Sequence, residues 1–331
     1  MRIVTLRHVV LLLGLFGRTA SVSAEQAIFD RFAEPCAGPE IRISGSPADR
    51  SMIEALETGY RDLRPDVKFS NSLFGPESTV AGIYTGTADL AFMARELREP
   101  MERMAFQWVR LTPPFSVPIA NGPLSVSRPS TQIAVYVHAD NPLKTASLAV
   151  LDAIFGAEHK RGDRLIRHWG DLGLENPWQD LPIKVLGPDP ESIDAVFFRR
   201  RVLQDSHKWN RAYEIFADGP AILKHLRDTP GAIAIAPLSD HMAGVRALAV
   251  STAPGRQAWL PEQDAITEGR YPLGRVVSVA LYRVPEKPIA AACRRFLDYV
   301  LSVEGQAVLK QHSHYLPLGV KQRQHSEALV Q

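Results

Sequence analysis

The sequence predicts an α/β protein with two lobes. Strand-like apolar runs alternate with helical patterns along the chain, which is typical of a sheet covered by helices. The chain has 331 residues, more than one small core usually organises. We find no internal repeat, low-complexity segment or long linker, so crossing strands are expected to join the lobes.

The N-terminus has the features of a secretory signal peptide. Arg2 and Arg7 precede an apolar run at residues 9–16, and small residues follow at 19–24. The apolar run is far shorter than the ~20 residues that cross a bilayer. We therefore expect residues 1–24 to be removed after Ala24 and the mature protein to be periplasmic.

Strand and helix patterns alternate through the first third of the mature chain. Residues 41–44 alternate apolar and polar side chains, as a half-buried strand does. Apolar residues then recur at helical spacing over 52–63. Further strands are expected at 67–72 and 88–93, with a helix over 80–84 between them. Such alternation predicts a sheet with some parallel pairing.

The same alternation continues to the C-terminus. The remaining strands are expected at residues 131–138, 183–186, 232–237 and 276–282. The remaining helices are expected at residues 148–155, from 193 onward, at 221–226 and, as one long amphipathic helix, at 288–311.

Three of the strand–helix joints carry hydroxyl side chains. Gly45-Ser46, Ser78-Thr79 and Ser192 occupy them. A helix start has N–H groups without an internal partner and the positive end of the helix dipole, which together favour a small anion. Ligands of α/β sheets lie beyond the strand ends, where helices begin. These joints are therefore candidates for anion binding.

A capped helix without a ligand is the alternative interpretation of the first joint. Ser46 is a good N-cap and Pro47 fits the first helical position. Asp49 follows the cap by three residues, much as in a capping box. Both interpretations of the joint stay open on local sequence alone.

Two cysteines, Cys36 and Cys293, are present. In an oxidising compartment a lone pair of this kind is expected to form a disulfide, with a reactive thiol as the alternative. Glu34 and Pro35 before Cys36 do not make a lipoprotein processing site, so no lipid anchor is expected.

Other function classes find little support. The net charge of +2 gives no reason to expect a nucleic-acid partner. His312 and His314 could share one face of a strand, but two nitrogens without a carboxylate or cysteine make a poor metal site. We find no nucleophile elbow, phosphate loop or zinc-protease motif. The sequence therefore predicts no enzyme activity, no metal and no cofactor.

The chain resembles the substrate-binding proteins of phosphate-type ABC transporters, which have the type II periplasmic-binding fold. The matching stretches span nearly the whole mature chain. They read, in order, IRISGSPADRSM, GPESTVAGIYTGTADLAFMAREL, IAVYVHADNPLKTASLAVLDAIFG, HWGDLG, GPDPESIDAVFF, PGAIAIAP, YPLGRVVSVALYRVPEKP and FLDYVLSVEGQAVLKQHSHYLPL.

The resemblance implies two α/β lobes joined by two crossing hinge strands, with the ligand in the cleft between them. Residues 25–133 and 273–331 would form lobe 1, and residues 134–272 would form lobe 2. Both cysteines would then lie in lobe 1. It also implies a small, phosphate-like anionic solute and the membrane subunits of an ABC transporter as partners. We expect a monomer.

In this family, phosphate is held by backbone N–H groups and hydroxyls at three helix starts. The first two starts match the joints at residues 45–46 and 78–79, although Pro47 offers no N–H. At the end of the following strand the family has Asp or Ser, whereas this chain has Ala94 with Arg95 beside it. Phosphate recognition is therefore expected to be altered.

The third helix start departs furthest from the family pattern of an arginine, three residues and then Ser-Gly-Thr. Pro188 stands at the arginine position, and Ser192-Ile193-Asp194 replaces the triplet. Losing the arginine and the threonine hydroxyl would remove roughly 3–6 kcal/mol of binding free energy. Phosphate is thus expected to bind weakly, with Ser192 as the main contact from lobe 2.

Nearby arginines could compensate for the lost one. The candidates are Arg95, Arg50 and the tripeptide Arg199-Arg200-Arg201, although the tripeptide also fits a solvated helix end. The alternative function is a relative that has lost or changed its ligand and acts in signalling or as a scaffold. The predicted ligand set is Gly45, Ser46, Ser78, Thr79, Arg95 and Ser192.

Overall fold

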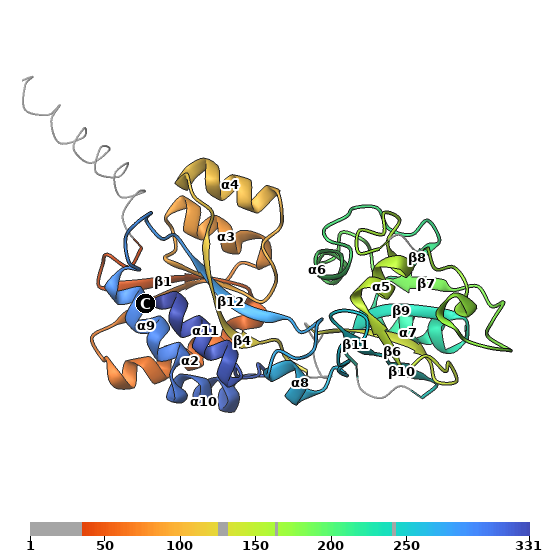
Figure 1. Ribbon diagram of the computed structural model, residues 1–331. Helices are drawn as coiled ribbons and strands as arrows, with labels where there is room; N and C mark the ends of the chain where they lie inside the picture. Colours follow the sequence, from red (N-terminus) through yellow and green to blue (C-terminus); the bar gives the residue numbers. More distant parts are fainter. Residues whose placement is uncertain (1–34, 125–131, 163–164, 240–242) are drawn as a thin grey trace, which may run out of the picture.

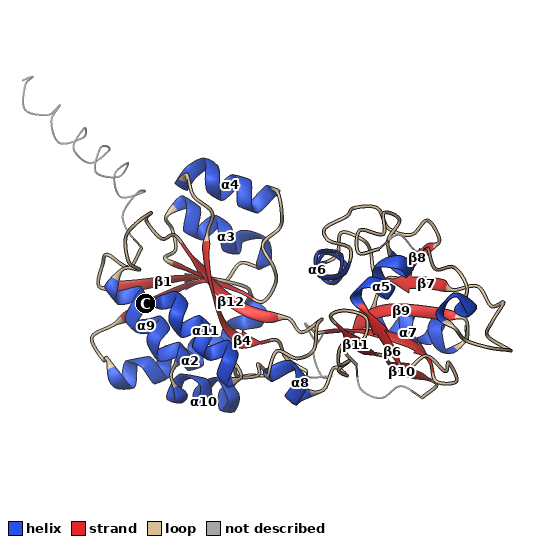
Figure 2. Cartoon of the chain, viewed as in Figure 1, coloured by secondary structure: helices blue, strands red, loops and turns tan. Residues whose placement is uncertain are grey.

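The structure is a computed structural model that describes residues 35–124, 132–162, 165–239 and 243–331. It has two lobes, each built around a five-stranded mixed sheet (Figures 1 and 2). The predicted two-lobed α/β class is confirmed. The predicted signal peptide lies outside the described residues. Within those residues, we find no helix that is both long and apolar enough to span a membrane.

The first sheet has the strand order β2-β1-β3-β12-β4. Its strands are β1 (Glu40–Ser44), β2 (Lys68–Ser72), β3 (Leu90–Met93), β4 (Phe115–Asn121) and β12 (Val276–Leu281). Strand β1 runs parallel to β2 and β3, whereas β12 runs antiparallel to β3 and β4. The sheet therefore joins a strand from near the C-terminus to four strands from the first third of the chain.

Helices cover both faces of the first sheet (Figure 1). They are η1 (Pro47–Asp49), α2 (Arg50–Leu63), α3 (Pro76–Thr85), α4 (Met101–Arg110), α9 (Ala291–Leu301), α10 (Val303–His312) and α11 (Val320–Val330). Helices α3 and α4 lie on one side, and α2, α9, α10 and α11 on the other. Met52, Ile53 and Leu56 of α2 are fully buried in the core that α2 shares with α9 and the sheet.

The second sheet has the strand order β10-β5-β9-β7-β8. Its strands are β5 (Ile133–His138), β7 (Lys184–Gly187), β8 (Tyr213–Ile215), β9 (Ala232–Pro237) and β10 (Val245–Ala247), and a separate parallel pair is formed by β6 (Thr145–Ser147) and β11 (Ala249–Ser251). The accompanying helices are α5 (Leu148–Phe155), η2 (Trp169–Leu172), α6 (Ile193–Val202), α7 (Gly219–Arg227) and α8 (Gln263–Thr267).

The central strands of the second sheet are buried on both faces. One face packs against α5 and α6 in a core that includes Phe155, Phe198 and Trp169. Ile222 and Leu226 of α7 cover the other face. Burial on both faces explains why β5 and β9 read as nearly continuous apolar runs in the sequence.

The two segments that cross between the sheets are tied together by one side chain. The Gln132 side-chain amide donates to the carbonyl oxygens of Gly122 and Arg275, at 3.1 and 2.9 Å. The Arg275 backbone N–H donates back to Gln132 Oε1 at 2.8 Å. Gln132 directly precedes β5 and Arg275 directly precedes β12, so the crossing lies just before the strands expected at residues 131–138 and 276–282.

The predicted disulfide is confirmed. Cys36 and Cys293 are bonded, with their Cα atoms 5.6 Å apart. Cys293 belongs to α9, and the Cys36 backbone N–H donates to Asp89 Oδ1 just before β3. The disulfide therefore ties the segment before β1 to a C-terminal helix of the same lobe.

The predicted long helix at 288–311 is wrong, because the chain forms two helices there. Ser302 separates α9 from α10, and its hydroxyl accepts a hydrogen bond from the Gly305 N–H at 3.1 Å. A Cβ atom on Gly305 would lie 2.1 Å from the Tyr299 carbonyl oxygen, so only glycine permits this tight turn. The periodicity of apolar residues continued through the break and concealed it.

His312 and His314 do not lie on a strand. His312 is the last residue of α10, and His314 lies in the loop that follows. Helix α4 and strand β4 were not predicted at all. Three large side chains of α4, Met101, Met104 and Trp108, are exposed, so its apolar pattern does not mark a buried face.

Candidate functional site

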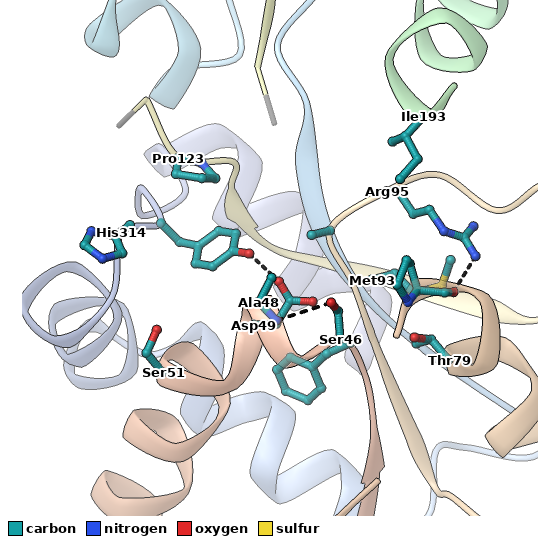
Figure 3. A pocket seen from close by; sticks show the side chains of 14 residues that line it. Ser46, Ala48, Asp49, Ser51, Thr79, Met93, Arg95, Pro123, Ile193 and His314 are labelled. Carbon is teal, nitrogen blue, oxygen red and sulfur yellow. Dashed lines mark hydrogen bonds between the residues drawn. The ribbon is translucent and has the colours of Figure 1, made fainter. Parts of the chain in front are cut away.

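A cavity of about 300 Å³ lies where β1 and β3 end and where α2 and α3 begin (Figure 3). Most of its wall comes from the first lobe, and Ile193 of α6 contributes from the second lobe. Of the predicted ligand set, Ser46, Thr79 and Arg95 line the cavity. Gly45, Ser78 and Ser192 are not among the described residues that line it.

Ser46 caps the first helix start, as the sequence predicts. Its hydroxyl oxygen accepts a hydrogen bond from the Ala48 N–H at 3.3 Å, and Pro47 occupies the first turn. Gly45 is buried behind it, and a Cβ atom there would lie 3.1 Å from the Leu73 side chain. A serine hydroxyl that accepts in this way still has its own proton to donate. Ser46 therefore offers a donor to a ligand in the cavity.

Asp49 is a lining residue whose place in the cavity the sequence did not reveal. Its side chain is only 2% exposed, and its Oδ1 accepts a hydrogen bond from the Tyr315 hydroxyl. Tyr315 lies in the loop after α10, and both side chains line the cavity (Figure 3). Burial raises the pKa of the Asp49 carboxyl, against the opposing effects of the Tyr315 hydroxyl and the Ser46 backbone. The Asp49 carboxyl group therefore lies beside the helix start at Ser46 that the sequence suggested as an anion site.

This raised pKa has a measurable consequence for stability. The folded state binds the Asp49 proton more tightly than the unfolded state, so the resulting stabilisation is present below the ordinary pKa of 3.8. It is lost as the pH rises through the raised pKa. The free energy of unfolding of wild type minus that of Asp49→Asn should therefore fall as pH rises from about 3.5 to 7. Urea titrations of both proteins across this range would measure it, and a constant difference would contradict the pKa direction.

The second helix start holds its hydroxyls differently. Ser78 Oγ and Thr79 Oγ1 each donate to the Gly75 carbonyl oxygen at 3.0 Å. Gly75 is the N-cap of α3 and has φ of 123°, a conformation that favours glycine. Because both hydroxyl protons are used, neither hydroxyl donates to a ligand in this arrangement. The start of α3 can therefore favour an anion through its helix dipole more than through hydrogen bonds from these side chains.

Arg95 lines the cavity, but groups of the protein already bind both terminal nitrogens of its guanidinium. Nη1 donates to Glu102 Oε2 at 2.9 Å and to the Glu96 carbonyl at 2.8 Å. Nη2 donates to the Pro76 carbonyl and to Glu102 Oε1. The pairing with Glu102 leaves Arg95 a poor substitute for the arginine that the family pattern has elsewhere.

The second lobe faces the cavity with an apolar residue. Ile193 lines it, while Ser192 caps α6 by accepting from the Ala195 N–H at 3.2 Å. Asp194 is held by Arg275, whose Nη1 donates to Asp194 Oδ1 at 3.0 Å. Pro188 is bound at its carbonyl by the Tyr213 hydroxyl at 2.7 Å. The positions that carry the arginine and the triplet in the family thus serve internal contacts here.

The arginine tripeptide is only in part a solvated helix end, because Arg199 is buried and Arg200 half-buried, whereas Arg201 is exposed. Arg199 is buried and binds Asp205 and His207. Arg200 reaches the first lobe, where Nη1 donates to the Leu97 carbonyl at 2.6 Å. Arg201 donates to the Pro272 carbonyl. Hydrogen bonds to neighbouring loops thus give all three arginines structural contacts, although Arg201 remains exposed.

A comparison with protein families identifies the class. The model of the PBP superfamily domain matches residues 30–304, and the chain therefore belongs to this superfamily of periplasmic-binding-type proteins. The chain is 27% identical over 278 residues to the phosphate-binding protein PstS of Pseudomonas aeruginosa, a match that covers 84% of this chain and 82% of that protein.

Solved structures show the same fold at lower identity. The chain aligns with PstS from Borrelia burgdorferi at a TM-score of 0.59 and 14% identity, over 85% of this chain and 99% of that one. It aligns with an ABC-type phosphate transport receptor from Vibrio cholerae at a TM-score of 0.54 and 16% identity, over 83% of this chain and 99% of that one.

Proposed function

We propose that this protein is an exported periplasmic solute-binding protein that holds a small oxyanion in the cleft between its lobes for an ABC transporter. It is proposed to bind without catalysis and to work as a monomer. The curated relative is named as a phosphate-binding protein, which supports the oxyanion. The proposed lobe boundaries remain residues 25–133 with 273–331, and 134–272.

One observation carries the proposal. The starts of α2 and α3 converge on a single cavity that residues of both lobes line. Helix starts favour negative charge, and the Ser46 hydroxyl can add a hydrogen bond to an anion. We place the ligand against Ser46 and Thr79, with Gly45, Ser78, Arg95 and Ser192 supporting the walls around it.

A relative without a transported ligand is the second candidate. The guanidinium of Arg95 is paired with Glu102, and that of Arg275 is paired with Asp194 and Glu96. Neither pairing leaves a cation directed at the cavity in the way a strong phosphate site requires. Such a protein would keep the fold for signalling or as a scaffold.

Titration calorimetry of the mature protein with inorganic phosphate and sulfate separates the two candidates. We expect phosphate to bind weakly, well above a micromolar dissociation constant, and Ser46→Ala to weaken binding about 10- to 100-fold, since a hydrogen bond to a charged group contributes roughly 1.5–3 kcal/mol.

Ser147→Ala is the matched control for this titration. Ser147 caps α5 with the same 3.3 Å hydrogen bond, to the Val150 N–H, but does not line the cavity. Its replacement should leave binding unchanged. If no oxyanion binds at millimolar concentration, the second candidate replaces the first. Sub-micromolar phosphate binding that Ser46→Ala leaves intact would show that the site lies elsewhere.

A further inference from the structure

The cavity wall is mainly apolar, which is unusual for a site that would hold a small inorganic ion. The apolar lining residues are Ala48, Pro76, Phe92, Met93, Ala94, Pro123 and Ile193. Phosphate and sulfate present oxygen in every direction, so an apolar wall would leave some of those oxygens desolvated and without partners. The wall instead suits a ligand that is apolar on one side.

The size of the cavity supports the same conclusion. Its volume of about 300 Å³ lies at the lower end of sites for small organic ligands, which run from roughly 300 to 1,000 Å³. One water molecule takes about 30 Å³, so the cavity has room for on the order of ten heavy atoms. Inorganic phosphate has half that number.

The charges around the cavity disfavour a dianion. Of the described lining residues, only Arg95 and His314 have basic side chains, and Glu102 pairs with Arg95. The Asp49 carboxylate lies in the same wall, 2% exposed. A carboxylate beside the anion site repels a second negative charge but accepts a hydrogen bond from a protonated oxygen.

Asp49 has the capacity to accept such a bond. A carboxylate has about four lone-pair sites, and the Tyr315 hydroxyl takes one of them. Tyr315 also lines the cavity, and its hydroxyl holds the carboxylate in place. A ligand with an acidic O–H can therefore bind Asp49 while its other oxygens face Ser46 and the helix starts.

We propose that the cavity selects an oxyanion with one acidic O–H and one apolar substituent, as in an alkyl- or arylphosphonate, over inorganic phosphate. The O–H donates to Asp49, and the substituent lies against Met93, Ala94 and Ile193. Sulfonates and carboxylates of the same shape lack the proton near neutral pH and bind less well. The proposal rests on the proposed function, because it names the ligand of the same cleft.

Calorimetry at pH 6 with phenylphosphonate, benzenesulfonate and inorganic phosphate tests the proposal. A phosphoryl group keeps its second proton in part at this pH, since its second pKa is about 6. We expect phenylphosphonate to bind at least tenfold more tightly than either competitor. Phosphate binding as tight as phenylphosphonate would overturn the inference and leave the proposed function standing. Absence of binding by all three would overturn both.

Two variants locate the selectivity. Asp49→Asn should reduce the preference for phenylphosphonate over benzenesulfonate at least tenfold. The amide has no negative charge, and it replaces one acceptor oxygen with an N–H₂ donor. Ile193→Ser, at a partly exposed position that the fold tolerates, should weaken phenylphosphonate about threefold to tenfold and leave phosphate unchanged. Asp66→Asn is the control, since Asp66 is exposed and pairs with Arg64 away from the cavity. An unaltered preference in both cavity variants would overturn the assignment.

Discussion

Replacing both cysteines with alanine is expected to lower the free energy of unfolding by about 2–5 kcal/mol, the range for losing a native disulfide. Cys36 and Cys293 are separated by 257 positions, so their bond restricts a long loop of the unfolded chain. Such a restriction raises the free energy of the unfolded state and so stabilises the folded one. Both residues are buried in the first core, which adds lost packing to the effect.

Urea denaturation with and without a reductant checks this expectation. Reduced wild type should unfold at nearly the same urea concentration as the double alanine variant. The reductant should have no effect on the variant, which serves as its own control. Equal midpoints for oxidised wild type and the variant would show that the disulfide contributes little.

Arg275→Ala is expected to destabilise the protein by about 3–5 kcal/mol, the cost of leaving a buried charge without its partner. The Arg275 side chain is 1% exposed and lies 3.0 Å from Asp194 and 3.4 Å from Glu96. Its guanidinium also stacks over the Phe197 ring at 4.4 Å. Removal would leave the two carboxylates without their shared cation beside the cleft.

The matched control is Arg294→Ala. Arg294 and Asp298 form an exposed ion pair one turn apart on α9, with both side chains about half exposed. Such pairs contribute about 0–1 kcal/mol, so this change should be nearly neutral. Thermal and urea unfolding of both variants would give the two values. A loss below 1 kcal/mol for Arg275→Ala would contradict the structural role assigned to it.

The sequence predicted those parts of the fold that depend on neighbouring residues. The strand at 41–44, the Ser46 cap and the helix after it rest on local periodicity and capping, which a single sequence contains. The break at Ser302 was missed because the helical spacing of apolar residues continues through it. The cap itself is formed by one serine, which does not interrupt that spacing.

The candidate site was harder to predict because its contacts join distant residues. Asp49 and Tyr315 are 266 positions apart, and Arg275 and Asp194 are 81 apart. No local pattern links either pair. Asp49 resembled a capping residue, and only the packing of the C-terminal loop against α2 shows that it also lines the cavity. Arg199 likewise read as a surface charge until its burial was known.

The hydrogen bonds of Gln132 restrict how the two lobes can move. Gln132 belongs to the first crossing segment and Arg275 to the second, so the segments cannot slide past each other without breaking the two hydrogen bonds that join these residues. A motion that preserves these hydrogen bonds must rotate both segments together about one axis. We therefore expect any change in the angle between the lobes to pivot near Gln132 and Arg275, and not to shear one crossing segment along the other.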